Sequence, residues 1–133
     1  MLSVEHIGIA VKQLSTAIPL FEKLLQTQCY KTEAVTSEQV NTAFFNAGNT
    51  KIELLESSQA DGVIAKFIDK KGEGIHHIAF EVADIYTEIQ RLKNEGFVVL
   101  NEVPKLGADN KLVCFLHPKS TNSVLIELCM EIQ

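Results

Sequence analysis

Two histidines and two glutamates stand at matching places in two parts of the chain. His6 lies in "VEHIGIAV" and His77 in "GIHHIAFEV", while Glu53 lies in "KIELLE" and Glu127 in "VLIELC". Imidazole nitrogen and carboxylate oxygen together suit a borderline or hard divalent ion that keeps positions open for a substrate. A carboxylate in the middle of an apolar strand is costly to bury unless a cation neutralises it.

Strand alternation indicates which of two adjacent histidines belongs to this set. Side chains point to opposite faces in turn, so His6 shares its face with small residues and leaves the branched apolar residues to the other face. His77 takes the same place in the second strand, whereas His76 takes the place of Glu5. We therefore interpret His76 as structural or partly exposed at the strand end. Histidine and glutamate repeated at matched positions favour a metal site over isolated core residues.

Each histidine strand precedes a helix and three strand-like segments. The first helix is expected from Ser15 to Leu25, where Pro19 would kink it unless it lies in the first turn. The second begins after an N-cap at Asp84 and stops at Gly96. The predicted strands are "CYKTEAV", "QVNTAFFNA" and "TKIELLE" after the first helix, then "FVVLNEV", "KLVCFLH" and "SVLIELCM" after the second.

This repeat predicts an α+β fold of two tandem βαβββ modules. The first covers about residues 1–57, the second about 74–133, and a linker of about 58–73 contains "VIAKFIDK", a predicted short helix. A chain of 133 residues fits one domain, so both modules are expected to form a single domain over residues 1–133. Two copies indicate a duplicated module, not a solenoid.

Composition excludes several classes of protein. With 46% hydrophobic and 22% charged residues the chain is expected to be globular, and its net charge of −5 argues against nucleic acid or anionic membrane as partner. No apolar run has the length of a membrane span, and no secretion signal is recognisable, so the cytoplasm is the expected location. Cys29, Cys114 and Cys129 have no CxxC spacing and are expected to be reduced, buried thiols.

The two-module pattern resembles the vicinal-oxygen-chelate superfamily, which includes glyoxalases, extradiol dioxygenases and bleomycin-resistance proteins. Within it the chain closely resembles the methylmalonyl-CoA epimerase family. The phrases "EHIGIAVKQL", "KIELLE", "IAKFIDKKGEGIHHIAFEV" and "FLHPKSTNSVLIELC" carry the resemblance over nearly the whole chain. It implies a curled mixed sheet around a metal site, a divalent cobalt, manganese or zinc ion, an acyl-CoA substrate and a homodimer.

The resemblance also implies roles for single residues. His6, His77 and Glu127 match the metal ligands of the family, and Glu53 matches the remaining position, where some members have glutamine. Glu38, in "TSEQV", matches one acid/base of the epimerases, and Glu127 is placed to serve as the other. The implied reaction is metal-dependent epimerisation of (2R)- and (2S)-methylmalonyl-CoA by 1,1-proton transfer through an enolate chelated to the metal. Without the resemblance, Glu38 would be taken for a surface glutamate.

Two other functions stay open at this point. The four ligand candidates also suit a glyoxalase I (lactoylglutathione lyase)-type isomerase, although "HPKSTNSVLIEL" lacks the "DPDG"-like turn typical of glyoxalases. A non-catalytic, bleomycin-resistance-like binding protein would not need four ligands on open faces. The chain also departs from the epimerase pattern, with "GADN" and "STNS" in place of glycine-rich loops that could border the substrate, and with Pro19 in the first helix.

Overall fold

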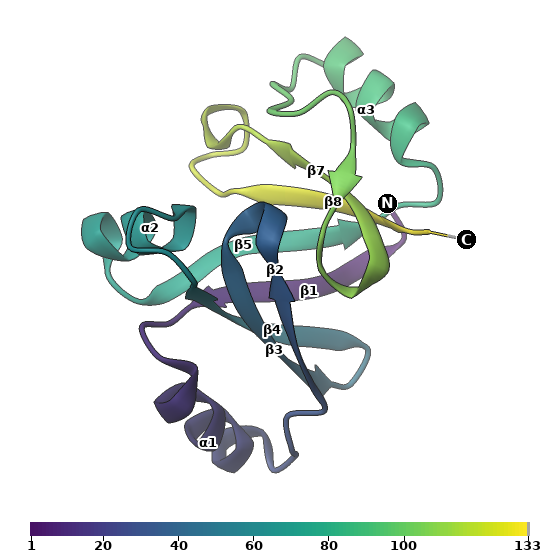
Figure 1. Ribbon diagram of the computed structural model, residues 1–133. Coiled ribbons are helices and arrows are strands. Elements are labelled where there is room, and N and C mark those ends of the chain that lie inside the picture. The colour runs from purple at the N-terminus through teal and green to yellow at the C-terminus, as the bar shows by residue number, and fades with distance from the viewer. Residues whose placement is uncertain (133) are drawn as a thin grey trace. The chain divides into compact units, whose positions relative to one another are not determined.

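The two histidine strands each open a series of one helix and three further strands, as the repeat predicts. A computed structural model describes residues 1–132 (Figure 1). The elements in chain order are β1 (Ser3–Ala10), α1 (Leu14–Leu25), β2 (Lys31–Val35), η1 (Thr36–Glu38), β3 (Val40–Ala47), β4 (Thr50–Ser57), α2 (Val63–Lys71), β5 (Gly74–Glu81), α3 (Ile85–Asn94), β6 (Lys105–Leu106), η2 (Ala108–Asn110), β7 (Lys111–Leu116), η3 (Pro118–Ser120) and β8 (Ile126–Glu131). The prediction of two βαβββ modules is confirmed, and so is the short helix of the linker, which is α2. Among residues 1–132, no helix combines the length and the apolar character needed to cross a membrane.

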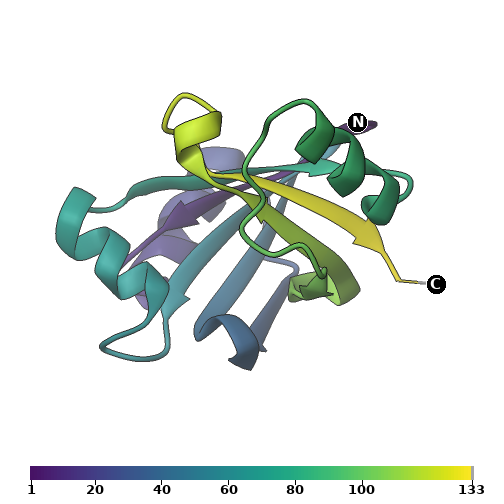
Figure 2. The ribbon, with the colours of Figure 1, turned by 90° about the horizontal axis from the view of Figure 1, so that it is seen from above.

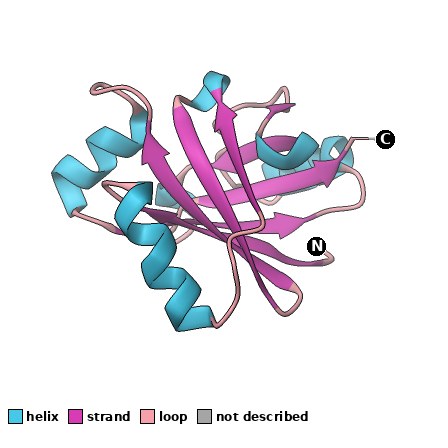
Figure 3. Cartoon of the chain, turned by 60° about the horizontal axis from the view of Figure 1, so that its bottom comes forward, coloured by secondary structure: helices cyan, strands magenta, loops and turns pink. Residues whose placement is uncertain are grey.

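The elements form two units, each with its own core. The N-terminal unit is His6–His76, and the C-terminal unit combines Met1–Glu5 with the chain from His77 onward. In the N-terminal unit the strand order is β2-β3-β4-β1, with β4 parallel to β1 and antiparallel to β3. Figure 3 shows α1 lying across these strands. Its apolar side packs on the face of the sheet that contains Ile9, Ala43, Phe45, Ile52 and Leu54.

Helix α1 keeps Pro19 in its interior, beyond the first turn. Gln13 provides no side-chain cap, but the Glu56 carboxylate accepts a hydrogen bond from the backbone N–H of Leu14 at 3.2 Å. The helix ends where Gln26 takes a left-handed conformation, with φ of 53°. Packing of the apolar side against the sheet therefore maintains a helix that local propensity alone disfavours.

The C-terminal unit has the strand order β5-β8-β7-β6, with β5 parallel to β8 and the other pairs antiparallel. Helix α3 lies along β7 and β8 (Figure 2), and its buried residues Ile85, Ile89 and Leu92 pack against Cys114 and Leu128. Asp84 is the N-cap that the sequence predicts, since its carboxylate accepts from the backbone N–H groups of Tyr86 at 3.0 Å and Thr87 at 3.3 Å.

The predicted strand "FVVLNEV" is wrong. This segment contributes an isolated bridge between Val99 and Leu116, and β6 forms later, at Lys105–Leu106. The reason is Asn101, whose side-chain amide takes the place of a neighbouring backbone. Its Oδ1 accepts from the N–H of Phe115 at 2.9 Å, and its Nδ2 donates to the carbonyl of Val113 at 3.2 Å. A side chain thus satisfies the edge of β7 where a strand would have done so.

We predict that Asn101→Ala lowers the free energy of unfolding by about 1–3 kcal/mol, because two partly buried backbone groups of β7 lose their partners. Urea denaturation monitored by circular dichroism measures this change. Asn46→Ala removes an amide from an exposed position in β3 and serves as the matched control. Equal unfolding midpoints for the two variants would contradict this role for Asn101.

Candidate active site

The first candidate pair is buried in the N-terminal unit. His6 Nδ1 lies 3.1 Å from Glu53 Oε2, and the two residues are 5% and 3% exposed. Parallel pairing of β1 with β4 places Gly8 directly beside Glu53. His6 is two residues earlier on the same face, so the imidazole reaches the carboxylate over a residue that has no side chain. The strand alternation read from the sequence predicts this shared face correctly.

The second pair repeats the first in the C-terminal unit. His77 Nε2 lies 3.3 Å from Glu127 Oε1, and each residue is 5% exposed. Here β5 is parallel to β8, and Ala79 is the small residue beside the glutamate. Each unit thus brings one predicted histidine together with one predicted glutamate on the sheet face that does not contact its helix.

A phenylalanine stands opposite each glutamate, and neither residue is among the site residues predicted from the sequence. Phe44 of β3 pairs with Glu53, and Phe115 of β7 pairs with Glu127. The Phe115 ring also meets the His77 ring edge-on, with 6.1 Å between centroids. The available signal was the matched position of "AFF" and "CFL" in the strand before each glutamate. These rings restrict water around the carboxylates, which increases the stabilisation that a neutralising cation would provide.

The residues present fit a divalent ion. Each unit supplies one imidazole nitrogen and one carboxylate oxygen, both buried, and such a carboxylate requires nearby positive charge. A protonated imidazole or a metal ion could meet that need, and nitrogen with oxygen is the donor set of a borderline ion. Thr42 lies on the Glu53 face of β3. Among residues 1–132, its hydroxyl is a buried side-chain oxygen that has no hydrogen-bond partner.

Glu38 is not part of either pair but belongs to η1, in the connection between β2 and β3. It is half-buried, so it is not the freely exposed glutamate that its polar surroundings suggest. The next residue, Gln39, is left-handed with φ of 56°, and its N–H donates to the Thr36 carbonyl at 3.1 Å. Its carbonyl accepts from the N–H of Ser58 at 2.9 Å, which ties the connection to the end of β4.

His76 is structural, as the alternation indicates. Its ring contacts Phe67 of α2 edge-on, with 4.9 Å between centroids. Burial, and to a smaller extent the positive charge of Lys71, lowers the pKa of His76 from 6.5 to about 4. The imidazole is therefore neutral at physiological pH and serves as a packing group between β5 and α2.

We predict that His76 makes the protein less stable as pH falls from 6.5 to 4. Below 6.5 the unfolded state binds a proton that the folded state binds only near pH 4, so up to about 3 kcal/mol of stability is lost in this window. His76→Phe should reduce the difference between unfolding free energies measured at pH 7 and pH 4. His117→Gln is the control at a histidine outside both pairs, and an equal reduction in that variant would contradict the prediction.

Two of the three cysteines are the buried thiols that the sequence predicts, and all three are free. Burial raises the pKa of Cys114 to about 11 and that of Cys129 further still. Cys29 is half-buried, which corrects its expected burial. Neither buried thiol is suited to act as a nucleophile at neutral pH.

The two loops that depart from the epimerase pattern share one conformation. Asp109 and Asn110 have φ of 59° and 56°, and Asn122 and Ser123 have φ of 53° and 70°. The left-handed region favours glycine, and aspartate and asparagine tolerate it better than most other residues. Each loop therefore contains two consecutive left-handed residues, none of which is glycine.

Two βαβββ modules, each with a buried histidine–glutamate pair, define a protein of the vicinal-oxygen-chelate class. The family model of the glyoxalase/bleomycin resistance protein/dioxygenase superfamily matches residues 5–115. The chain is 40% identical to human mitochondrial methylmalonyl-CoA epimerase over 92% of its own length and 70% of that protein. It is also 40% identical to the ethylmalonyl-CoA/methylmalonyl-CoA epimerase of Cereibacter sphaeroides, covering 92% and 93% of the two chains.

A solved structure of a methylmalonyl-CoA epimerase in complex with methylmalonyl-CoA is similar to this fold. Its TM-score is 0.92 at 30% identity, and the match covers 98% of this chain and 95% of that one. The chain therefore belongs to the glyoxalase/bleomycin resistance protein/dioxygenase superfamily and, within it, to the methylmalonyl-CoA epimerase family.

Proposed function

We propose that this protein interconverts (2R)- and (2S)-methylmalonyl-CoA by moving a proton at the carbon between the carboxylate and the thioester. The observation that carries the proposal is the histidine–glutamate pair buried in both units of a chain from this epimerase family. Curated relatives at 40% identity have this activity in their names. The small-molecule partner is accordingly an acyl-CoA.

The proposed ligands of the metal are His6, Glu53, His77 and Glu127, which together would hold one cobalt, manganese or zinc ion. Two neutral imidazoles and two carboxylates balance the charge of a divalent cation, and their burial protects the site from water. When bound, such a cation supplies Lewis-acid stabilisation of negative charge on substrate oxygens. Phe44 and Phe115 flank the two carboxylates and keep water from them.

Inversion at carbon requires two acid/base groups, one for each face of the substrate. We assign these roles to Glu38 and Glu127: one removes the proton from the α-carbon, and the other delivers a proton to the opposite face. A positioned acid/base typically contributes ~10²–10⁴ to the rate. The hydrogen bond from the Ser58 backbone N–H to the Gln39 carbonyl supports Glu38 in this role, because it fixes the backbone beside this half-buried carboxylate.

Glu38→Gln is predicted to abolish epimerisation while the fold and metal binding persist, because the amide cannot accept the α-proton. Proton NMR of the metal-loaded protein with methylmalonyl-CoA in heavy water follows loss of the α-proton signal. Glu95→Gln, at an exposed carboxylate at the end of α3, is the control and should retain turnover. Wild-type turnover in Glu38→Gln would rule out the assignment.

The same measurement separates the competing functions. A wild-type protein that leaves the α-proton in place but converts the methylglyoxal–glutathione hemithioacetal would be a glyoxalase I-type isomerase. A protein that does neither would be a binding protein of this fold. A cytoplasmic location and a homodimer remain predictions, which cell fractionation and light scattering can test.

Metal loading is predicted to raise the thermal stability of the protein. An ion that binds the folded state at a hundredfold excess over its Kd stabilises that state by about 2.7 kcal/mol. Adding cobalt, manganese or zinc to protein stripped with a chelator should therefore raise the Tm, and elemental analysis should find one ion per chain. His77→Ala should lose this response and His117→Ala should keep it. An undiminished response in His77→Ala would contradict the ligand set.

A further inference from the structure

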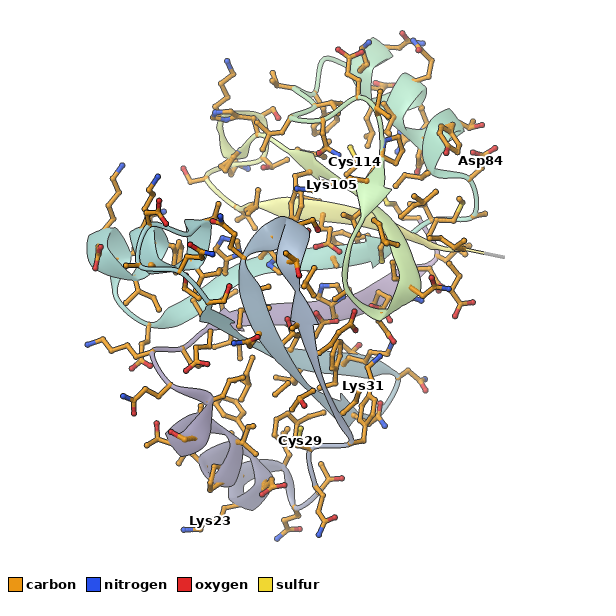
Figure 4. All side chains as sticks on the ribbon, viewed as in Figure 1. Lys23, Cys29, Lys31, Asp84, Lys105 and Cys114 are labelled. Carbon is orange, nitrogen blue, oxygen red and sulfur yellow. The ribbon has the colours of Figure 1, made fainter. Side chains whose placement is uncertain are left out.

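Lys105 places a positive charge next to the second histidine–glutamate pair. It is exposed on β6, where Figure 4 labels it. Its ammonium stands over the Phe115 ring, 5.7 Å from the ring centroid. Phe115 is the residue opposite Glu127, and its ring also contacts His77. A single aromatic ring therefore separates the ammonium from the proposed metal ligands of the C-terminal unit.

The Lys105 charge is not neutralised within its unit. Two other lysines of the unit have carboxylate partners. Lys93 forms an ion pair with Glu102, and Nζ of Lys111 lies 3.5 Å from Oε1 of Glu131. Among the described residues of the C-terminal unit, no carboxylate lies within ion-pair distance of the Lys105 ammonium. In a protein with a net charge of −5, a cation without a counter-charge on the rim of a site is suited to attract an anionic ligand.

The backbone holds Lys105 in place. Gly107 lies so close to β7 that a Cβ atom there would come within 2.9 Å of Val113, and its N–H donates to the carbonyl of Lys111 at 2.9 Å. The left-handed residues Asp109 and Asn110 close the turn. This tight hairpin pairs Lys105 with Val113, two residues before Phe115, and thereby aims the lysine along the ring.

The N-terminal unit contains the same combination. The Nζ atom of Lys31 stands 4.6 Å from the centroid of the Phe44 ring, and Phe44 lies opposite Glu53. The same Nζ atom, however, lies 3.6 Å from Oε1 of Glu33. A glutamate, a phenylalanine and a lysine thus lie next to one another in both units. The register differs, because Lys31 is paired directly with Phe44 whereas Lys105 is paired with Val113. Of the two, Lys105 is the one that has no carboxylate partner among the described residues of its own unit.

We propose that Lys105 binds an anionic oxygen group of the acyl-CoA substrate, an inference that rests on the proposed function. Two groups of such a substrate share this chemistry, the carboxylate of the acyl part and the phosphates of CoA. An ammonium on an aromatic ring keeps its charge and can donate to either. Lys105 has no role in proton transfer, so its loss should weaken substrate binding without slowing the chemical step.

The test compares Lys105→Met with the wild type on two thioesters, methylmalonyl-CoA and methylmalonyl-pantetheine, which lacks the CoA phosphates. We expect the KM for methylmalonyl-CoA to rise about tenfold at unchanged kcat, which corresponds to the loss of about 1.4 kcal/mol of binding free energy. Lys105→Arg should keep most of the affinity. Lys23→Met is the matched control, because Lys23 lies on the outer side of α1 (Figure 4).

A higher KM for both thioesters would support binding of the acyl carboxylate, and a higher KM for the CoA thioester alone would support binding of a phosphate. An unchanged KM for both, or an equal rise in Lys23→Met, would overturn the proposal. If the wild type does not epimerise, the proposed function fails separately. In that case calorimetric titration with methylmalonyl-CoA compares the Kd of the wild type with that of Lys105→Met. A higher Kd in the variant would support the role of Lys105 in binding, and equal Kd values would overturn it.

Discussion

Burial of one carboxylate among the strands of each unit is the constraint on which the rest of the site depends. Glu53 and Glu127 are almost fully enclosed, and an isolated charge in such a place is costly enough that a positive partner must accompany it. In each unit a histidine on the adjacent parallel strand lies beside the carboxylate, at 3.1 Å from Glu53 and 3.3 Å from Glu127. A protonated imidazole or a bound cation would offset the negative charge, which a neutral imidazole does not. A cation held by such a pair would therefore remove this cost.

The surrounding residues follow from that requirement. The small residues Gly8 and Ala79 lie beside the glutamates and allow the imidazoles to approach. Phe44 and Phe115 cover the carboxylates from the opposite side, which increases both the cost of the bare charge and the gain from neutralising it. Helices α1 and α3 pack on the other face of the strands in their units. In each unit the strands thus separate a core that stabilises the fold from a face whose polar groups are available for chemistry.

The sequence predicts the pairs because both depend on the two-residue period of a strand, which is a local property. The alternation of side chains along a strand predicts that His6 and His77 share a face with the glutamates and that His76 lies on the opposite face, which packs against the helices. The prediction of a strand at "FVVLNEV" is wrong because the side-chain amide of Asn101 bonds to β7 in place of backbone groups. The hydrophobic pattern of the sequence contains no sign of such side-chain hydrogen bonds. The association of Lys105 with Phe115 depends on the register between β6 and β7, which a tight hairpin determines and a hydrophobic pattern does not.

The two proposed acid/base residues occupy different structural settings, and this difference has chemical consequences. Glu127 is held in a strand beside His77, whereas Glu38 stands on a short connection between strands. In the proposed assignment Glu127 would both hold the cation and exchange a proton, whereas Glu38 would exchange a proton only. The two directions of epimerisation would then begin from residues in different settings, and the near-symmetry of the two modules would not extend to the proton transfers that they support.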